Sequence, residues 1–122
     1  MGLFSFLRKL PKDAPLPPFY LQSNSEARRP CGLPELLAGL QALRTDPDEF
    51  LILEPAEPVR DVRFLQAAGV DGGIDVELSI RRGGDWALLG QVYTDDQTVR
   101  QIFLDFFQKG HLPPLKGFTP VF

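Results

Sequence analysis

The chain has 122 residues, of which 43% are hydrophobic and 24% are charged, and its formal net charge is −3. This length and this balance fit one globular domain of ordinary size that buries its own core. The mildly acidic charge argues against a nucleic-acid partner, because nucleic-acid-binding proteins usually carry a basic stripe.

The cysteine content and the distribution of apolar residues bear on location. Cys31 is the single cysteine, which excludes an intrachain disulfide or a CxxC metal motif and is typical of a reducing compartment. No apolar run approaches the ~20 residues that cross a bilayer. Near the N-terminus the basic residues follow the apolar ones, the reverse of a secretory signal. These observations predict a cytoplasmic protein, and no cofactor or metal is expected.

Residues 1–32 are predicted to form a short helix and an extended Pro-rich arm, ahead of a single α+β domain at 33–122. Apolar residues recur at helical spacing up to Pro11, and the segment 11–32 then holds five prolines without a regular period. The decapeptide combines apolar and basic side chains: Leu3, Phe4, Phe6, Leu7, Leu10, Arg8 and Lys9. Such a set can lie on an anionic membrane surface or dock on a protein, so its apolar members are candidates for a partner surface.

The regular elements begin at Leu33. Apolar spacing in LPELLAGLQALRT, with Pro34 in the first turn, predicts an amphipathic helix. Strands are predicted to follow at 50–54, 62–68, 74–82 and 86–93, each bounded by turn residues. The third, IDVELSIRR, alternates apolar and polar residues without interruption. A last helix is predicted over about 95–109, with Gly110 as its C-cap.

This order of elements predicts an α+β fold in which a four-stranded antiparallel meander is flanked by an N-terminal and a C-terminal helix. Sequential strands joined by tight turns favour antiparallel neighbours, and helices at the two ends favour packing on a sheet face. The hairpin at RRGGD leaves its register open. A two-residue loop places Arg81 opposite Trp86, whereas a three-residue loop places Ile80 opposite Leu88. We favour the three-residue loop because it matches two apolar faces.

The segment TDDQTVRQIFLDFFQKG, residues 94–110, raises the question whether adjacent aspartates carry chemistry. Thr94 as N-cap and Gln97 three positions later predict a capping box, with Asp95 and Asp96 in the first turn. A stripe of apolar residues then predicts a face packed on the sheet; it comprises Val99, Ile102, Phe103, Phe106 and Phe107. Leu104 lies off this stripe, so Leu104 and Phe107 are candidates for contact with a partner.

No set of reactive residues converges in the sequence. His111 is the single histidine and follows the last helix, where it more often contacts carbonyl groups than acts as a base. Cys31 has no recognisable nucleophile context. The groups GVDGG and RRGGD lie between strands and match no phosphate-binding motif. Asp75 and Glu77 are predicted on the polar face of the third strand, where they are candidates for a partner-facing surface.

The run FLILE, then RFLQAA, then GGIDVELSIRRGGDWALLGQVYTDDQTVRQIFLDFFQKG resembles small bacterial α+β proteins of unknown function. The resemblance covers residues 33 to about 118 and excludes the arm. It implies a bacterial source and an α+β fold, and it transfers no catalytic residue.

These observations favour a non-enzymatic protein-interaction domain of bacterial type, such as an immunity or adaptor protein, with a protein partner or a second copy of the chain. Two alternatives stay open. The first is a small ligand-binding protein or enzyme with a pocket between the sheet and the last helix. The second is a peripheral membrane protein that binds through residues 1–12.

Overall fold

The structure is a computed structural model, and it describes residues 15–121. Four of the residues predicted as candidates for a partner surface, Leu3, Phe4, Phe6 and Leu7, therefore lie outside the described residues. The elements follow one another as β1 (Phe19–Ser23), β2 (Arg29–Cys31), α2 (Leu33–Thr45), β3 (Phe50–Pro55), β4 (Val62–Val70), β5 (Gly73–Arg82), β6 (Asp85–Tyr93), α3 (Asp96–Lys109) and β7 (Thr119–Pro120).

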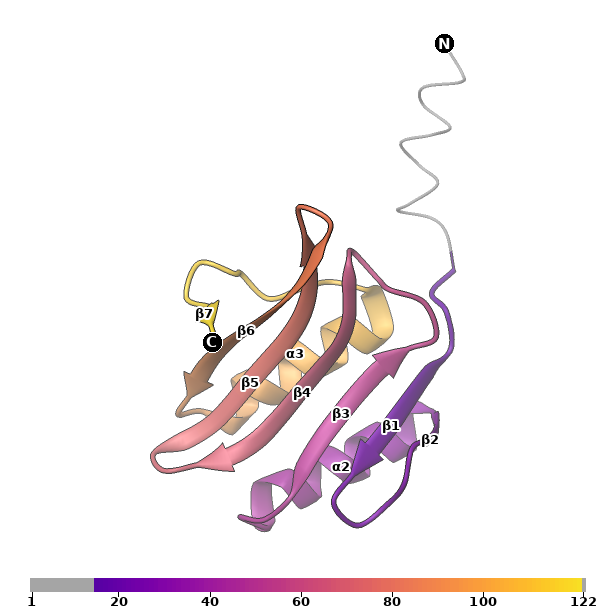
Figure 1. The fold of residues 1–122 in the computed structure, drawn as a ribbon. Helices are drawn as coiled ribbons and strands as arrows, with labels where there is room; N and C mark the ends of the chain where they lie inside the picture. The colour runs from indigo at the N-terminus through magenta and orange to yellow at the C-terminus, as the bar shows by residue number, and fades with distance from the viewer. Residues whose placement is uncertain (1–14, 122) are drawn as a thin grey trace.

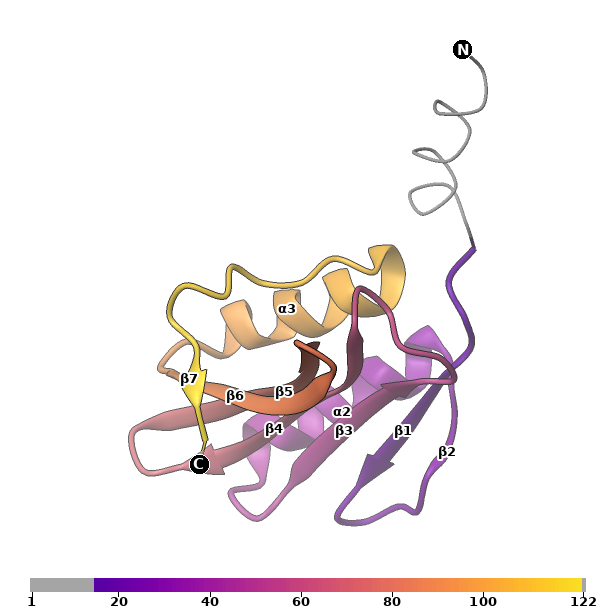
Figure 2. The ribbon, with the colours of Figure 1, turned by 45° about the horizontal axis from the view of Figure 1, so that its top comes forward.

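One antiparallel sheet with the strand order β2-β1-β3-β4-β5-β6-β7 forms the body of the molecule. Helices α2 and α3 lie side by side behind the sheet in Figure 1, and Figure 2 shows both on the same side of the strands. The α+β class, the antiparallel sheet and the two helices are as the sequence predicts. The prediction of four strands is wrong, because the sheet has seven.

The three strands that the sequence does not reveal lie at the two edges of the sheet. β1 and β2 form a hairpin within the segment predicted as an arm, and β1 then pairs with β3 from Phe19↔Pro55 to Ser23↔Leu51. The buried Glu49 carboxylate fixes this hairpin, because it accepts hydrogen bonds from the backbone N–H of Asn24 at 2.7 Å and from the backbone N–H of Phe50 at 3.0 Å. Prolines and short length hide these strands from a periodicity search.

Both helices begin close to the predicted residues, but the N-cap of the second helix differs from the prediction. α2 starts after Gly32, whose amide donates to the Glu35 carboxylate at 2.9 Å. α3 is capped by Asp95 rather than by Thr94, as its carboxylate accepts from the Gln97 amide at 3.0 Å and from the Thr98 hydroxyl at 2.8 Å. The prediction of Thr94 as N-cap is therefore wrong by one residue, because a carboxylate can accept both donors at once.

The register of the β5–β6 hairpin is the two-residue alternative, with Arg82 opposite Asp85 and Arg81 opposite Trp86. The three-residue loop favoured from the sequence is wrong. Gly83 and Gly84 have φ of 57° and 89°, and two consecutive positive values are the signature of the tight turn that fits the twist of a hairpin. The register puts Glu77 opposite Gly90 and Asp75 opposite Val92. The three-residue loop predicts Gln91 and Tyr93 at these two places.

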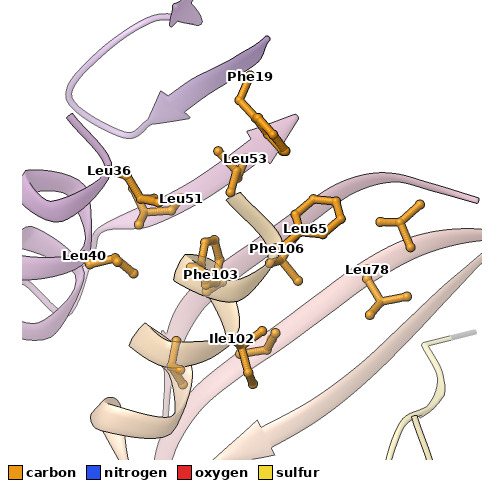
Figure 3. Close-up of a cluster of buried hydrophobic side chains, with 14 of the residues drawn as sticks. Phe19, Leu36, Leu40, Leu51, Leu53, Leu65, Leu78, Ile102, Phe103 and Phe106 are labelled. Atoms are coloured by element: carbon orange, nitrogen blue, oxygen red, sulfur yellow. The ribbon is translucent and has the colours of Figure 1, made fainter. Parts of the chain in front are cut away.

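A single hydrophobic core fills the space between the sheet and the two helices (Figure 3). Phe103 and Phe106 of α3 are fully buried in it, and the Phe106 ring meets Phe19 of β1 edge-on at 5.6 Å. Leu36 of α2 lies over Leu51 of β3 in the same core. The C-terminal segment continues across the sheet edge and buries Phe118. The body of the protein is thus held together on one face of the sheet.

Candidate functional site

The other face of the sheet is not covered by a helix, and Figure 1 views it directly. We call it the open face. Successive strand residues point to opposite sides, so the residues that alternate with the core lie here. It is formed by Tyr20, Gln22, Phe50, Ile52, Glu54, Phe64, Gln66, Ala68, Asp75, Glu77, Ser79, Arg81, Trp86, Leu88, Gly90 and Val92.

A pair of carboxyl groups, Asp75 and Glu77, lies near one end of the open face. The Gln66 amide donates to the Glu77 carboxylate at 2.8 Å across the β4–β5 ladder. Asp75 belongs to a row that is otherwise apolar, because Ala68 and Val92 are its direct neighbours on the two adjacent strands. Asp75 therefore lies between apolar residues, with the Glu77 carboxylate two residues away on the same side of the strand.

The surroundings of this carboxyl pair change its titration. Burial raises the pKa of Asp75 to about 6, and a hydrogen bond and charge repulsion from Glu77 act in the same direction. The Asp75 carboxyl group therefore holds its proton more strongly than an exposed aspartate. A cationic group placed over the pair would stabilise both charges.

Two shallow hollows flank the carboxyl pair. The first has a volume of about 290 Å³ and is lined mainly by apolar atoms of β3 and β4, including Phe50, Ile52 and Ala68. The second, of about 360 Å³, lies towards β7 and is lined by Val92 and Val121 among others. Asp75 and Glu77 border both hollows. The two hollows suit side chains that project from a docked surface.

The opposite end of the open face carries a cluster of two arginines and a tryptophan, Arg63, Arg81 and Trp86. The guanidinium carbon of Arg63 lies 4.5 Å from the centroid of the Trp86 ring, and that of Arg81 lies 4.8 Å from it. Both distances are typical of cation–π contacts. No ion pair within residues 15–121 involves Arg63 or Arg81. The cluster thus presents two cations without a neutralising carboxylate.

The backbone before β4 positions Arg63. Val59 and Val62 exchange two hydrogen bonds of 2.9 Å around a tight turn in which Arg60 and Asp61 have φ of 50° and 65°. The ladder between β4 and β5 then shifts register between Val62 and Phe64, so Arg63 occupies a bulge. Its Nε donates to the Ser79 hydroxyl at 2.9 Å. The Arg63 side chain is therefore held against the open face.

The residues that the sequence singles out are divided between different parts of the molecule. Asp75 and Glu77 come together on the open face, as the alternation of β5 predicts. Leu104 and Phe107 lie on α3, half-buried against the core, and the Phe107 ring is 5.2 Å from Phe19. They therefore lie on the far side of the sheet from the carboxyl pair.

The reactive side chains weighed from the sequence lie apart from the open face. His111 follows α3 and is exposed. Cys31 lies on the edge strand β2, where burial, and secondarily Glu35, raise the pKa of its thiol to about 11. Such a thiol is protonated at neutral pH and is a weak nucleophile. Among residues 15–121, no group of three or more His, Cys, Asp or Glu side chains is placed to hold a metal ion.

The sequence pattern does not predict the arginine–tryptophan cluster or the apolar part of the open face. The bulge at Arg63 leaves no pattern that a period of two detects. The apolar residues left a signal, because FLILEP is apolar on both sides of the strand, yet only one side of it is covered by helices. A strand that is apolar on both sides is typical of a sheet that is covered on both faces.

Comparison of the chain with protein-family models, with curated proteins and with solved structures finds no match. Within residues 15–121, no helix has the length and apolar character needed to cross a membrane. Function is therefore inferred from the geometry of the described residues.

Proposed function

We propose that this chain is a non-enzymatic protein-interaction domain, of the kind that immunity and adaptor proteins use, and that the open face is its binding surface. The observation that carries the proposal is the mixed chemistry of this face. Half-exposed apolar side chains separate a carboxyl pair at one end from an arginine–tryptophan cluster at the other. Aromatic and arginine side chains among apolar groups are typical of protein interfaces.

The interior of the domain supports the same proposal. A filled core occupies the space between the sheet and α3, where Phe103 and Phe106 are fully buried. The hollow between α2 and α3, lined by Leu40 and Val99 among others, has a volume of about 40 Å³, which is too small for a substrate. A hollow of about 560 Å³ lies beside the end of α2 and the β4–β5 turn, lined by Thr45, Gly69 and Asp71 among others, and it is open to solvent. The hollows on the open face are likewise shallow and suit side chains of a partner better than an enclosed ligand.

A photo-crosslinking experiment tests the proposal. A photoreactive amino acid is placed at Ile52 or Leu88 on the open face, and at Arg100 or Gln108 on the exposed side of α3 as matched controls. We expect the open-face positions to form defined protein adducts in cells of the source organism, and the control positions to form none.

A binding measurement then tests whether the captured protein contacts the open face. The captured protein is purified and mixed with the unmodified chain and with Ile52→Glu, whose fold is checked by circular dichroism. We expect the unmodified chain to form a stoichiometric complex and Ile52→Glu to bind at least roughly tenfold more weakly, because a charge would be buried at the contact. Adducts that form equally from both sides of the molecule, or a complex unaffected by Ile52→Glu, would contradict the proposal.

A further inference from the structure

The open face carries charges of opposite sign at its two ends, and this polarity indicates which partner fits it. We propose that the open face binds the open face of a second copy of this chain, with the two sheets stacked and their strands running in opposite directions. The inference rests on the proposed function, because it names the partner of the same surface.

The separation of the charges suits a two-fold arrangement. Glu77 and Arg81 point to the same side of β5 and are four residues apart, which is about 13 Å along a strand. Ser79 lies midway between them, and the ladder places Phe64 and Leu88 beside it on the neighbouring strands. A two-fold axis along this row, between the stacked sheets, brings the carboxyl pair of each copy to the arginine–tryptophan cluster of the other. One surface is then complementary to itself, as a two-fold dimer requires.

The row on the axis is suited to the centre of an interface. Phe64 and Leu88 are half-exposed, and the Ser79 hydroxyl between them already accepts the hydrogen bond of Arg63. Stacking would bury these side chains against their own equivalents without leaving a polar group unpaired on the axis. Stacked sheets usually lie about 10 Å apart with nearly aligned strands, which gives side chains of this size room to interdigitate.

The dimensions of the open face also fit a dimer. The five neighbouring strands β1, β3, β4, β5 and β6 have 5, 6, 9, 10 and 9 residues. At about 3.3 Å per residue and about 4.8 Å between strands, the face offers about 600 Å². A standard stable interface buries about 800 Å² on each partner. Val92, which is 52% exposed, and Val121, which is 40% exposed, add apolar area beside the carboxyl pair.

The carboxyl pair is prepared for a cationic partner. Asp75 already lies among apolar side chains in the single chain, so part of the cost of removing it from water is met before binding. Within residues 15–121, the charged group that acts on the Asp75 carboxyl group is Glu77 of its own strand. The residues opposite Asp75 are Ala68 of β4 and Val92 of β6, and those opposite Glu77 are Gln66 and Gly90, all of them neutral. A guanidinium of the second copy would supply the opposite charge that these neighbours lack.

Charge-swapped variants of the full chain provide the experiment. One variant carries Asp75→Lys and Glu77→Lys, and the other carries Arg63→Glu and Arg81→Glu. Sedimentation velocity is measured for each variant alone, for an equimolar mixture and for the unmodified chain. We expect the unmodified chain to dimerise. Each variant alone is expected to dimerise at least about a hundredfold more weakly, because like charges then face each other. The mixture is expected to form a heterodimer with an affinity near that of the unmodified dimer.

Matched controls separate loss of the interface from loss of the fold. Arg100→Glu changes the same type of charge on the exposed side of α3 and should leave the dimer unchanged. Thermal unfolding of each variant shows whether it is folded. An unmodified chain that stays monomeric at all concentrations overturns the inference, as does a mixture of folded variants that remains monomeric. A monomeric chain that still crosslinks to another protein through Ile52 or Leu88 removes the homodimer and retains the proposed function.

Discussion

The two faces of the sheet are made by the same strands and differ in what lies against them. On the covered face, two helices lie against the strands, and most of the strand side chains there are buried and apolar. On the open face, apolar residues of similar size are only half-buried and alternate with carboxylates and arginines. Composition alone therefore does not distinguish the covered face from the open face, whereas the spacing of charges does.

Two neighbouring residues of β3 test the difference between the two faces most directly. Leu51 points into the core and is fully buried, whereas Ile52 points to the open face and is half-exposed. We expect Leu51→Ala to lower the free energy of unfolding by about 2–5 kcal/mol, because it leaves a cavity in a packed core. Ile52→Ala is expected to lower it by about 1 kcal/mol or less. Urea unfolding of both variants measures the difference.

The dilute, monomeric chain is the appropriate sample for this pair, since a dimer would cover Ile52. Equal losses of stability for the two variants would contradict the assignment of the two faces. They would indicate that something already covers the open face in the single chain.

The hairpin turn decides which residues of β6 belong to which face, because a slip of one residue would exchange the two sets. Gly83 has φ of 57°, in the left-handed region that disfavours residues with a Cβ atom. We expect Gly83→Ala to lower the free energy of unfolding by about 1–2 kcal/mol. Gly83→Asn is the matched control and should cost less, since asparagine tolerates this conformation.

Denaturant unfolding compares the two turn variants. If Gly83→Ala and Gly83→Asn are equally stable, and as stable as the unmodified chain, the tight two-residue turn is not what sets the register. A three-residue loop would then be favoured again.

The register of the β5–β6 hairpin could not be predicted from the sequence, whereas the elements themselves could. The alternation of β5 and the helical spacing of α2 and α3 predict these elements because each buries one side and exposes the other. WALLGQVY has Leu88 and Leu89 side by side, so its pattern fits either register, and only the conformations of Gly83 and Gly84 separate the two.

The parts of the candidate site were unequally predictable for the same reason. Asp75 and Glu77 could be placed on one face of β5 because the strand alternates without a slip. The contact of Arg63 with Trp86 depends on a bulge and on side-chain conformation, neither of which leaves a periodic signal. β1, β2 and β7 were missed because they are short and contain or adjoin prolines, so their pairing is decided by the rest of the sheet.

Titration of Asp75 on the open face gives a smaller effect on stability. Its pKa is raised from 3.8 to about 6, so the folded state favours the protonated form, and its contribution to stability is present below pH 3.8 and lost as the pH rises through about 6. We expect Asp75→Asn to stabilise the dilute chain above pH 6 by less than about 1 kcal/mol, because solvent screens a partly exposed group.

Thermal unfolding at several pH values measures this effect. Asp71→Asn, in the exposed turn between β4 and β5, is the matched control and should not change the pH profile. A profile of Asp75→Asn that runs parallel to that of the unmodified chain would show that the Asp75 carboxyl group is well hydrated.

The arginine–tryptophan cluster supplies a similarly small expected effect on stability and the most local signal. Trp86 is the single tryptophan of the chain, so its fluorescence reports on the cluster alone. Arg63→Ala removes the guanidinium over the ring and the hydrogen bond to Ser79. We expect the emission of Trp86 to shift to longer wavelength as water replaces the guanidinium, with a loss of stability of about 0.5–1 kcal/mol. Arg100→Ala on α3 is the control and should leave the emission unchanged, whereas an unchanged spectrum for Arg63→Ala would mean that the ring is not covered by Arg63 in solution.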